Sequence, residues 1–358
     1  MTTYMLIFAA ALILAAGVTP VMRRLAPRLG LIDQPNARKV HTNPVPLMGG
    51  VALYGAIIAA LLIFGDRFNV AQLVSILIGG TWVSFLGICD DRWGVTPMLK
   101  LAGQIVGALI LIVSGVQVAA FGLPAVNIGV TILWVVGITN ALNLMDNMDG
   151  LSGGVAATAA AYFLVMAVIS GQYLVAALSA ALVGACLGFL AYNFNPASIF
   201  MGDTGSLFLG FLLASLGIKL RFPANSALVT WMVPVMALGV LILDTSLVTV
   251  SRLRRRVNPL TTPGKDHLSH RLVAAGYSQR EAVLILYIVA EAFGLLAVLL
   301  TRADIREGYI FGAVVALACV YVIWKFEWGL KRRPDGVTVA GEPQPCGADS
   351  SPRHPCDG

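Results

Sequence analysis

Long apolar runs separated by short polar segments make up most of this chain. Each run is close to the ~20 residues that cross the hydrocarbon core of a bilayer as a helix. The runs cover residues 3–22, 48–64, 70–89, 99–120, 128–145, 152–170, 174–192, 205–220, 226–250, 281–300 and 308–326. Because lipid offers no hydrogen bonds to the backbone, the pattern predicts an all-α, polytopic membrane protein with about eleven transmembrane helices.

The composition supports a membrane protein and excludes an ordinary soluble one. Of the 358 residues, 58% are hydrophobic and 12% are charged, whereas soluble domains carry about 25% charged residues. The five cysteines show no metal-ligand spacing and indicate no disulfide framework. Residues 1–330 are expected to form a single transmembrane domain. Residues 331–358 contain few large apolar side chains and are expected to form a disordered tail.

Basic residues predict the orientation of the helices. When each connection is numbered by the run before it, the odd connections and the C-terminal tail hold nineteen of the twenty-four Lys and Arg. The positive-inside bias places these segments, including the tail, in the cytoplasm. No basic residue precedes the first run, so we expect a true span with its N-terminus outside rather than a cleaved signal.

A polar stretch at residues 139–151 ends the fifth run. Asn140, Asn143 and Asn147 have helical spacing, and Asp146 and Asp149 are also three residues apart. Carboxylate and amide oxygens are the hard ligands that suit Mg²⁺ or Mn²⁺. The stretch therefore indicates a metal or phosphate site, with a polar helix cap and turn as the alternative.

Further carboxylates lie on the same predicted side of the membrane. Asp90 and Asp91 are adjacent, so they repel each other unless a cation lies nearby, and Lys100 opens the next helix. Asp203 lies at a helix start, where it could bind a metal while backbone N–H groups bind phosphate. A simple Asp helix cap is the alternative for Asp203.

Two predicted cytoplasmic loops carry basic and histidine side chains. In the first, Lys39 and His41 could meet phosphate or lipid headgroups, and Gly49-Gly50 would let the next helix approach a neighbour closely. In the last, His267, His270 and Arg271 share one helical face, which suits diphosphate oxygens better than Zn²⁺. An interfacial helix anchored in anionic lipid is the alternative.

The ninth run, residues 226–250, contains Pro234 and Gly239, which together predict a bend. Asp244 lies within this apolar run, close to its cytoplasmic end.

From about Gly30 to Leu272 the chain resembles the polyprenyl-phosphate N-acetylhexosamine-1-phosphate transferases, relatives of the phospho-N-acetylmuramoyl-pentapeptide transferases. The resemblance is carried by Arg38-Lys39-Val40-His41 with Pro44, Pro46 and Gly49-Gly50; by Asp90-Asp91 with Pro97, Lys100-Leu101 and Gln104; by Asn140 to Leu151; and by Phe200 to Ser206. The shared order and the shared membrane side of these motifs make the resemblance specific.

The resemblance implies an enzyme that transfers a sugar-1-phosphate from a UDP-sugar to polyprenyl phosphate and releases UMP, so initiating a lipid-linked cell-surface glycan. It implies a plasma (inner) membrane protein with a cytoplasmic active site and Mg²⁺, or Mn²⁺, as cofactor. The implied partners are a UDP-N-acetylhexosamine, polyprenyl phosphate and the bilayer. A homodimer is left open, and no nucleic acid is expected.

The resemblance also implies roles for single residues. Asp90 and Asp91 would line the catalytic centre; Asp146 and Asp149 would support the nucleotide or the metal; and the histidine face would hold the diphosphate. The implied catalytic residues are Asp90, Asp91, Asp203, His267, His270 and Arg271; the substrate-binding residues are Lys39, His41, Lys100, Asn140, Asp146 and Asp149; and the metal ligands are Asn143 and Asp203.

Two positions depart from the family pattern. Asn147 occupies a position where relatives often have Gly, and Ser269 one where many relatives have His. The Arg-Lys-Val-His loop and the lack of a triple-histidine run favour N-acetylglucosamine-1-phosphate transfer over phospho-N-acetylmuramoyl-pentapeptide transfer.

Other classes fit less well. A membrane prenyltransferase should have a further Asp where Gly94 stands, and a CDP-alcohol phosphotransferase should not continue from Gly150 with Leu151-Ser152. A transporter should carry carboxylates at mid-bilayer depth and internal repeats, and we find neither.

Overall fold

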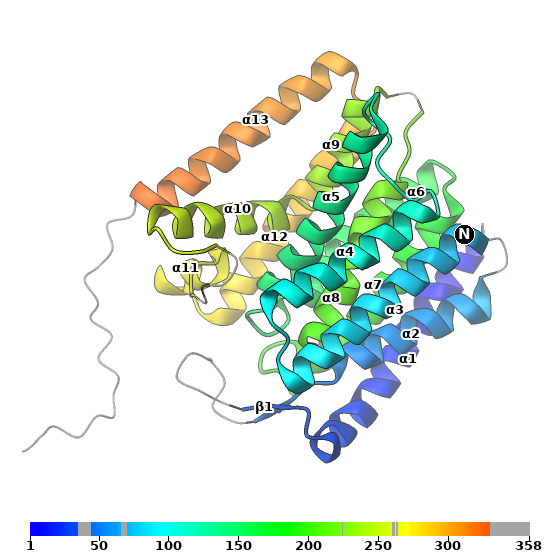
Figure 1. The fold of residues 1–358 in the computed structure, drawn as a ribbon, viewed down its shortest axis with the longest axis vertical. Coiled ribbons are helices and arrows are strands. Elements are labelled where there is room, and N and C mark those ends of the chain that lie inside the picture. The colour runs from blue at the N-terminus through cyan, green and yellow to red at the C-terminus, as the bar shows by residue number, and fades with distance from the viewer. Residues whose placement is uncertain (35–43, 66–69, 224, 260–261, 263, 330–358) are drawn as a thin grey trace, which may run out of the picture.

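The computed structural model describes residues 1–34, 44–65, 70–223, 225–259, 262 and 264–329 (Figure 1). Lys39, His41 and the tail at 331–358 lie outside this part of the chain. The helices are α1 (Thr2–Leu25), α2 (Gly49–Phe64), α3 (Val70–Trp93), α4 (Pro97–Val113), α5 (Pro124–Met145), α6 (Leu151–Ile169), α7 (Tyr173–Asn193), α8 (Gly202–Lys219), α9 (Ala227–Ala237), α10 (Gly239–Arg254), α11 (Leu268–Ala274), α12 (Gln279–Leu300) and α13 (Ile305–Trp324). A 3₁₀ turn (Ala26–Leu29) follows α1, and a π-helical turn, η2 (Lys325–Gly329), follows α13.

Every predicted apolar run contains a helix, although the run at 99–120 is helical only as far as Val113. This confirms an all-α, multi-pass membrane protein. Seven helices are long and apolar enough to cross a membrane, and α9 with α10 makes an eighth if the bent pair counts as one span. The shorter α2 and α4, and α8 with charged residues at both ends, account for the other three runs. Length and composition thus support seven or eight spans, and the predicted count of eleven stays a prediction.

The predicted bend in the ninth run is confirmed. The axes of α9 and α10 differ by 77°. Pro234 lies within α9 and cannot donate a backbone hydrogen bond, and Gly239 begins α10. A Cβ at Gly239 would lie 2.2 Å from the Phe293 ring of α12, so only glycine fits at this contact. Figure 1 shows α10 running across the bundle, close to α11.

The core of the bundle is built around α8, which packs against α2, α3 and α5. Most of its side chains are buried. Glycine permits the close approaches at its N-terminal end: a Cβ on Gly50 of α2 would lie 2.2 Å from the backbone nitrogen of Gly205, and one on Gly87 of α3 would lie 2.5 Å from Thr204. The expected close approach at Gly49-Gly50 is confirmed, and it brings the ends of three helices together.

A short hairpin that the all-α prediction did not include joins the first connection to α8. Strands β1 (Ile32–Asp33) and β2 (Val45–Pro46) pair antiparallel. Phe200 N donates to Pro46 O (2.9 Å), and Gly49 N donates to Phe200 O (3.0 Å). The hairpin therefore holds both flanks of the loop that contains Lys39 and His41 beside the start of α8.

Even and odd connections lie at opposite ends of the bundle. Among the even ones, Gln172 Nε2 donates to Arg221 O (2.8 Å), Lys219 Nζ donates to Gln72 Oε1 (2.7 Å), and Asn225 Nδ2 donates to Leu300 O (3.1 Å). The odd connections contact one another at the other end, as the next subsection shows. The structure thus preserves the alternation on which the predicted topology depends.

Candidate functional site

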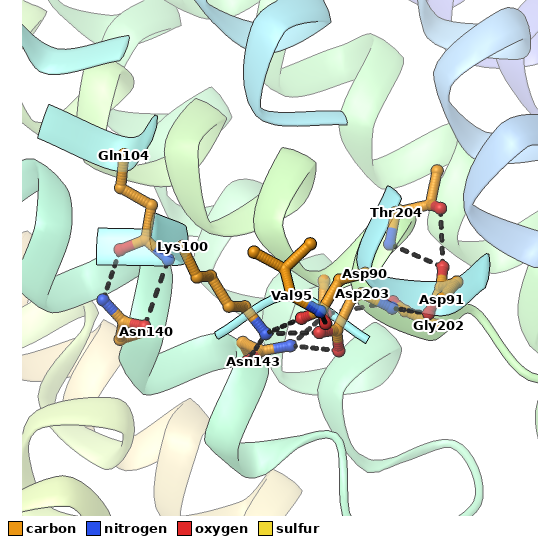
Figure 2. Close-up of polar contacts among 11 residues, drawn as sticks. Asp90, Asp91, Val95, Lys100, Gln104, Asn140, Asn143, Gly202, Asp203 and Thr204 are labelled. Atoms are coloured by element: carbon orange, nitrogen blue, oxygen red, sulfur yellow. Dashed lines mark hydrogen bonds and ion pairs between the residues drawn. The ribbon is translucent and has the colours of Figure 1, made fainter. Parts of the chain in front are cut away.

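Four helix termini meet at the end of the bundle that holds the odd connections. They are the C-termini of α3 and α5 and the N-termini of α4 and α8, and Figure 2 shows the side chains that they bring together. Asp90 comes from α3, Lys100 from α4, Asn143 from α5 and Asp203 from α8. The sequence separates these residues by up to 113 positions, and the structure joins them into one polar cluster.

The Lys100 ammonium group is the centre of this cluster. It forms ion pairs with Asp90 Oδ2 (2.8 Å) and with Asp203 Oδ2, and it donates to Asn143 Oδ1 (3.1 Å). Asn143 Nδ2 in turn donates to Asp203 Oδ1 (2.7 Å) and to Ser206 Oγ (2.8 Å). Two carboxylates and an amide oxygen therefore surround one cation. Asn143 and Asp203 are the metal ligands implied by the resemblance, and Asp90 is a third oxygen donor beside them.

Asp91 has a different environment from its neighbour Asp90. Its carboxylate accepts hydrogen bonds from Asp203 N (2.9 Å), Thr204 N (3.0 Å) and the Thr204 hydroxyl (2.6 Å). These are N–H groups of the first turn of α8, so Asp91 of α3 is the carboxylate that caps this helix. Asp203 is not the cap, and its carboxylate is directed to Lys100 and Asn143 instead (Figure 2).

Asn140 lies one turn before Asn143 and is paired within the bundle. Gln104 Nε2 of α4 donates to Asn140 Oδ1 (3.1 Å), and the Asn140 amide donates back to Gln104 Oε1 (Figure 2). Gln104 is 1% exposed. The pair satisfies the buried amide of Gln104 and the half-buried amide of Asn140 and joins α4 to α5, while the predicted substrate contact of Asn140 stays a prediction.

The turn between α5 and α6 holds two of the predicted carboxylates. Burial of Asp146, partly offset by the Ser152 hydroxyl (2.6 Å) and reinforced by the charges of Asp91 and Asp149, raises the pKa of Asp146 to about 7. Asp149 accepts from Asn195 Nδ2 (3.0 Å) and Ala197 N (2.9 Å). Asp149 therefore holds the α7–α8 connection in place, and Asp146 binds a proton more readily than an exposed carboxylate does.

Asn147 and Ser269, the two residues that depart from the family pattern, contact each other. The Ser269 hydroxyl donates to Asn147 Oδ1 (2.7 Å), and Ser269 is 1% exposed. This bond ties α11 to the α5–α6 turn, although 122 positions separate the two residues. Asn147 thus supplies the acceptor that the buried hydroxyl of Ser269 requires.

The histidine face lies at the start of α11. The rings of His267 and His270 are 6.3 Å apart. His267 is buried, and its Nδ1 lies 2.7 Å from Asp244 Oδ2. Burial, together with electrostatic repulsion from His267 and Lys265, lowers the pKa of His270 to about 4. His270 therefore offers a neutral imidazole at pH 7 rather than the charged donor expected from the sequence.

Arg271 binds to the turn η2, which follows the last helix, α13. Its guanidinium group forms an ion pair with Glu327 and donates to Phe326 O (3.0 Å), and its Nε donates to Asp266 O (2.8 Å). Glu327 also pairs with Arg254 (3.2 Å). The π-helical turn η2 therefore clamps α11, and a diphosphate would have to compete with Glu327 for Arg271.

Sequence reasoning assigned no role to Asp244 or Glu327. A carboxylate inside the ninth apolar run was the signal for Asp244, but its partner is distant in sequence. Glu291 was also missed: it lies halfway along α12 and accepts from the Tyr162 hydroxyl (2.7 Å). The expectation that no carboxylate lies at mid-span is wrong at this position.

The oxygen ligands fit a hard cation, although they are not a conventional cluster of acidic and histidine ligands. Within the part of the chain that the structure describes, no group of three or more His, Cys, Asp or Glu is arranged to hold a metal ion. Asp90, Asn143 and Asp203 nevertheless direct oxygens at the Lys100 ammonium, which is itself a cation. A second cation at this place would have to share these oxygens with Lys100 or displace it.

Comparison with known proteins identifies the family of the chain. Residues 73–221 match the model of "Glycosyl transferase family 4". A probable undecaprenyl-phosphate N-acetylglucosaminyl 1-phosphate transferase of Bacillus subtilis is 36% identical over 297 residues, covering 80% of this chain and 82% of that protein. A decaprenyl-phosphate N-acetylglucosaminephosphotransferase of Mycolicibacterium smegmatis is 32% identical, covering 88% and 86%.

The related pentapeptide branch is also similar, to a lesser degree. A phospho-N-acetylmuramoyl-pentapeptide-transferase of Bacillus thuringiensis is 30% identical over 301 residues, covering 78% of this chain and 90% of that protein. The chain thus belongs to glycosyl transferase family 4, the family of polyprenyl-phosphate N-acetylhexosamine-1-phosphate transferases that its motifs resemble.

Proposed function

We propose that this enzyme, a phosphoglycosyl transferase, moves N-acetylglucosamine-1-phosphate from UDP-N-acetylglucosamine to polyprenyl phosphate, in bacteria undecaprenyl phosphate, and releases UMP. The observation that carries the proposal is the convergence of Asp90, Lys100, Asn143 and Asp203 at one end of the bundle. Each comes from a motif that the sequence shares with the family, and the relatives named for this transfer match most of the chain.

The cluster suits a reaction between two phosphates. Donor and acceptor are both anionic and repel each other, so positive charge and fixed orientation are what the protein must supply. Lys100 supplies positive charge, and Asp90 with Asp203 holds its ammonium group in place. His267 and His270 would hydrogen-bond the diphosphate from the neighbouring α11.

Asp90, Asn143 and Asp203 would hold Mg²⁺ or Mn²⁺, because each offers an oxygen to the cation already among them. When bound, the metal would neutralise charge on the diphosphate. The phosphate monoester of the acceptor has a second pKa of ~6 and is mostly a dianion at pH 7, so it hardly needs a general base. Asp90 pairs with Lys100 and would help to hold the metal, and a role as general base is the second choice.

Release of UMP tests the reaction directly. Purified protein with polyprenyl phosphate, Mg²⁺ and UDP-N-acetylglucosamine is expected to release UMP and form a diphosphate-linked lipid. A panel of UDP-sugars, including UDP-N-acetylmuramoyl-pentapeptide, identifies the preferred donor. Absence of UMP with every donor would contradict the proposed function. Preference for the pentapeptide donor would show that the enzyme is a phospho-N-acetylmuramoyl-pentapeptide transferase instead.

We also propose that the odd connections and the site face the cytoplasm of the plasma (inner) membrane, with the N-terminus outside. The nineteen-to-five distribution of basic residues supports this orientation. Cysteine placed at Gly171 should react with an impermeant reagent in intact cells, whereas cysteine at Ser198 should react only after permeabilisation. Labelling at Ser198 but not at Gly171 in intact cells would reverse the orientation.

A transporter is not favoured, although Glu291 lies at mid-span. Its carboxylate is bound to Tyr162 on the neighbouring helix. The other carboxylates discussed above gather at one end of the bundle rather than along a path through it.

A further inference from the structure

The buried carboxylate of Asp244 is not explained by the roles assigned so far. Asp244 lies on α10, just after the 77° break, and is 1% exposed. Its Oδ1 accepts from Leu268 N (2.7 Å), and its Oδ2 lies 2.7 Å from His267 Nδ1. A buried carboxylate is costly unless its oxygens are hydrogen-bonded. Both oxygens of Asp244 are used on two consecutive residues at the start of α11.

This contact determines which nitrogen of His267 carries a proton. An ionised carboxylate only accepts hydrogen bonds, so Nδ1 of His267 must be the donor. Nε2 is then the nitrogen that can meet a ligand, and the ring cannot rotate without breaking the contact. The bond to Leu268 N also fixes the backbone that carries the ring.

The neighbouring arginines have other partners, so they leave the contact between Asp244 and His267 intact. Arg252 and Arg255 direct their guanidinium groups to Asp266, at 3.4 and 2.6 Å, instead of to Asp244. Arg271 is bound to Glu327. Lys265 contributes positive charge near the rings, and His270 is neutral at pH 7.

We propose that Asp244 is a positioning residue for the transfer reaction: it sets the tautomer and orientation of His267, so that Nε2 is presented to the diphosphate. The proposal rests on the proposed function for the identity of the ligand, whereas the proton on Nδ1 does not depend on it. When His267 takes a proton from solvent at Nε2 beside the anionic phosphates, the Asp244 carboxylate stabilises the imidazolium that forms.

Asp244→Asn is the variant that separates positioning from packing. Asn has the same shape and can still accept from Leu268 N, but its NH₂ group would face His267 and require an unprotonated Nδ1. The proton then moves to Nε2. We expect kcat to fall by about 10²-fold with little change in the KM of the donor, because the affected contact strengthens in the transition state. The double variant with His267→Gln should lose no more than His267→Gln alone.

Asp304→Asn is the matched control. Asp304 caps α13, accepting from Glu307 N (2.7 Å) at the opposite end of the bundle, and it has no histidine partner among the described residues. Its carboxamide variant should lose some stability and keep wild-type kcat.

The tautomer can be read directly by ¹⁵N NMR of histidine-labelled protein, since the chain contains four His and single His→Gln variants assign them. Wild-type His267 should show a protonated Nδ1, and Asp244→Asn should show an unprotonated Nδ1.

Three results would overturn the proposal: an unprotonated Nδ1 in the wild type, wild-type kcat in Asp244→Asn, or losses that multiply in the double variant. If Asp244→Asn does not fold, the wild-type tautomer decides. Failure of the proposed function itself would look different, because no UDP-sugar would then yield UMP while the His267 spectrum remained readable.

Discussion

Asp203→Ala is expected to abolish measurable turnover while the protein still inserts and folds. The side chain supplies one of the two carboxylates around Lys100 and accepts from Asn143 (2.7 Å), so its loss releases the ammonium group and removes a proposed metal ligand. Removing one preorganised electrostatic partner commonly costs about 10²–10³ in kcat, and here two partners are misplaced at once. UMP-release kinetics on purified protein, with Mg²⁺ titrated, measure the effect.

The control for Asp203→Ala is Asp304→Ala, which removes a carboxylate that does cap a helix. The structure assigns the capping of α8 to Asp91, so the Asp203 variant should keep the start of α8 intact. Full activity with unchanged Mg²⁺ dependence in Asp203→Ala would show that this carboxylate has only a structural part.

His270→Ala and Arg271→Ala should each lower kcat by about 10²–10³, with a smaller effect on the KM of the donor, if this face binds the diphosphate. Ser269→Ala should leave kcat nearly unchanged. Its lost bond to Asn147 should lower the free energy of unfolding by about 0.5–1.5 kcal/mol. Kinetics and thermal unfolding of the purified variants separate the two kinds of effect.

Glu327→Gln is the matched control for Arg271, because it weakens the clamp and leaves the arginine in place. If Arg271 acts on substrate, Arg271→Ala loses turnover and Glu327→Gln keeps it. If Arg271 only anchors α11, both variants should lower protein levels equally and turn over normally. Wild-type kcat in both the His270 and Arg271 variants would remove this face from the active site.

Much of the fold could be predicted because lipid imposes a simple rule on sequence. Apolar runs became helices, and Pro234 with Gly239 marked the break, since both effects are local. The hairpin β1–β2 escaped prediction, because its strands are too short to show a period. The helical spacing of His267, His270 and Arg271 did indicate the short α11.

The residues of the candidate site could be predicted from the sequence, but their contacts with one another could not. Asp90, Asn143 and Asp203 carry charge or amides at helix ends, which the sequence displays. Asp91 caps α8, a helix more than a hundred residues further along the chain. This contact depends on tertiary packing, which the sequence does not display. The same holds for Asn147 with Ser269 and for Asp244 with His267, where each partner looks unremarkable alone.

The ammonium group of Lys100 among the oxygens of Asp90, Asn143 and Asp203 has a consequence for how such a protein is made. Helices α3, α4, α5 and α8 leave the ribosome at different times, and their polar ends must find one another in a membrane. A cation supplied by the chain lets that assembly finish without waiting for an ion from solution. The bundle can therefore be completed before the metal proposed for this site would bind.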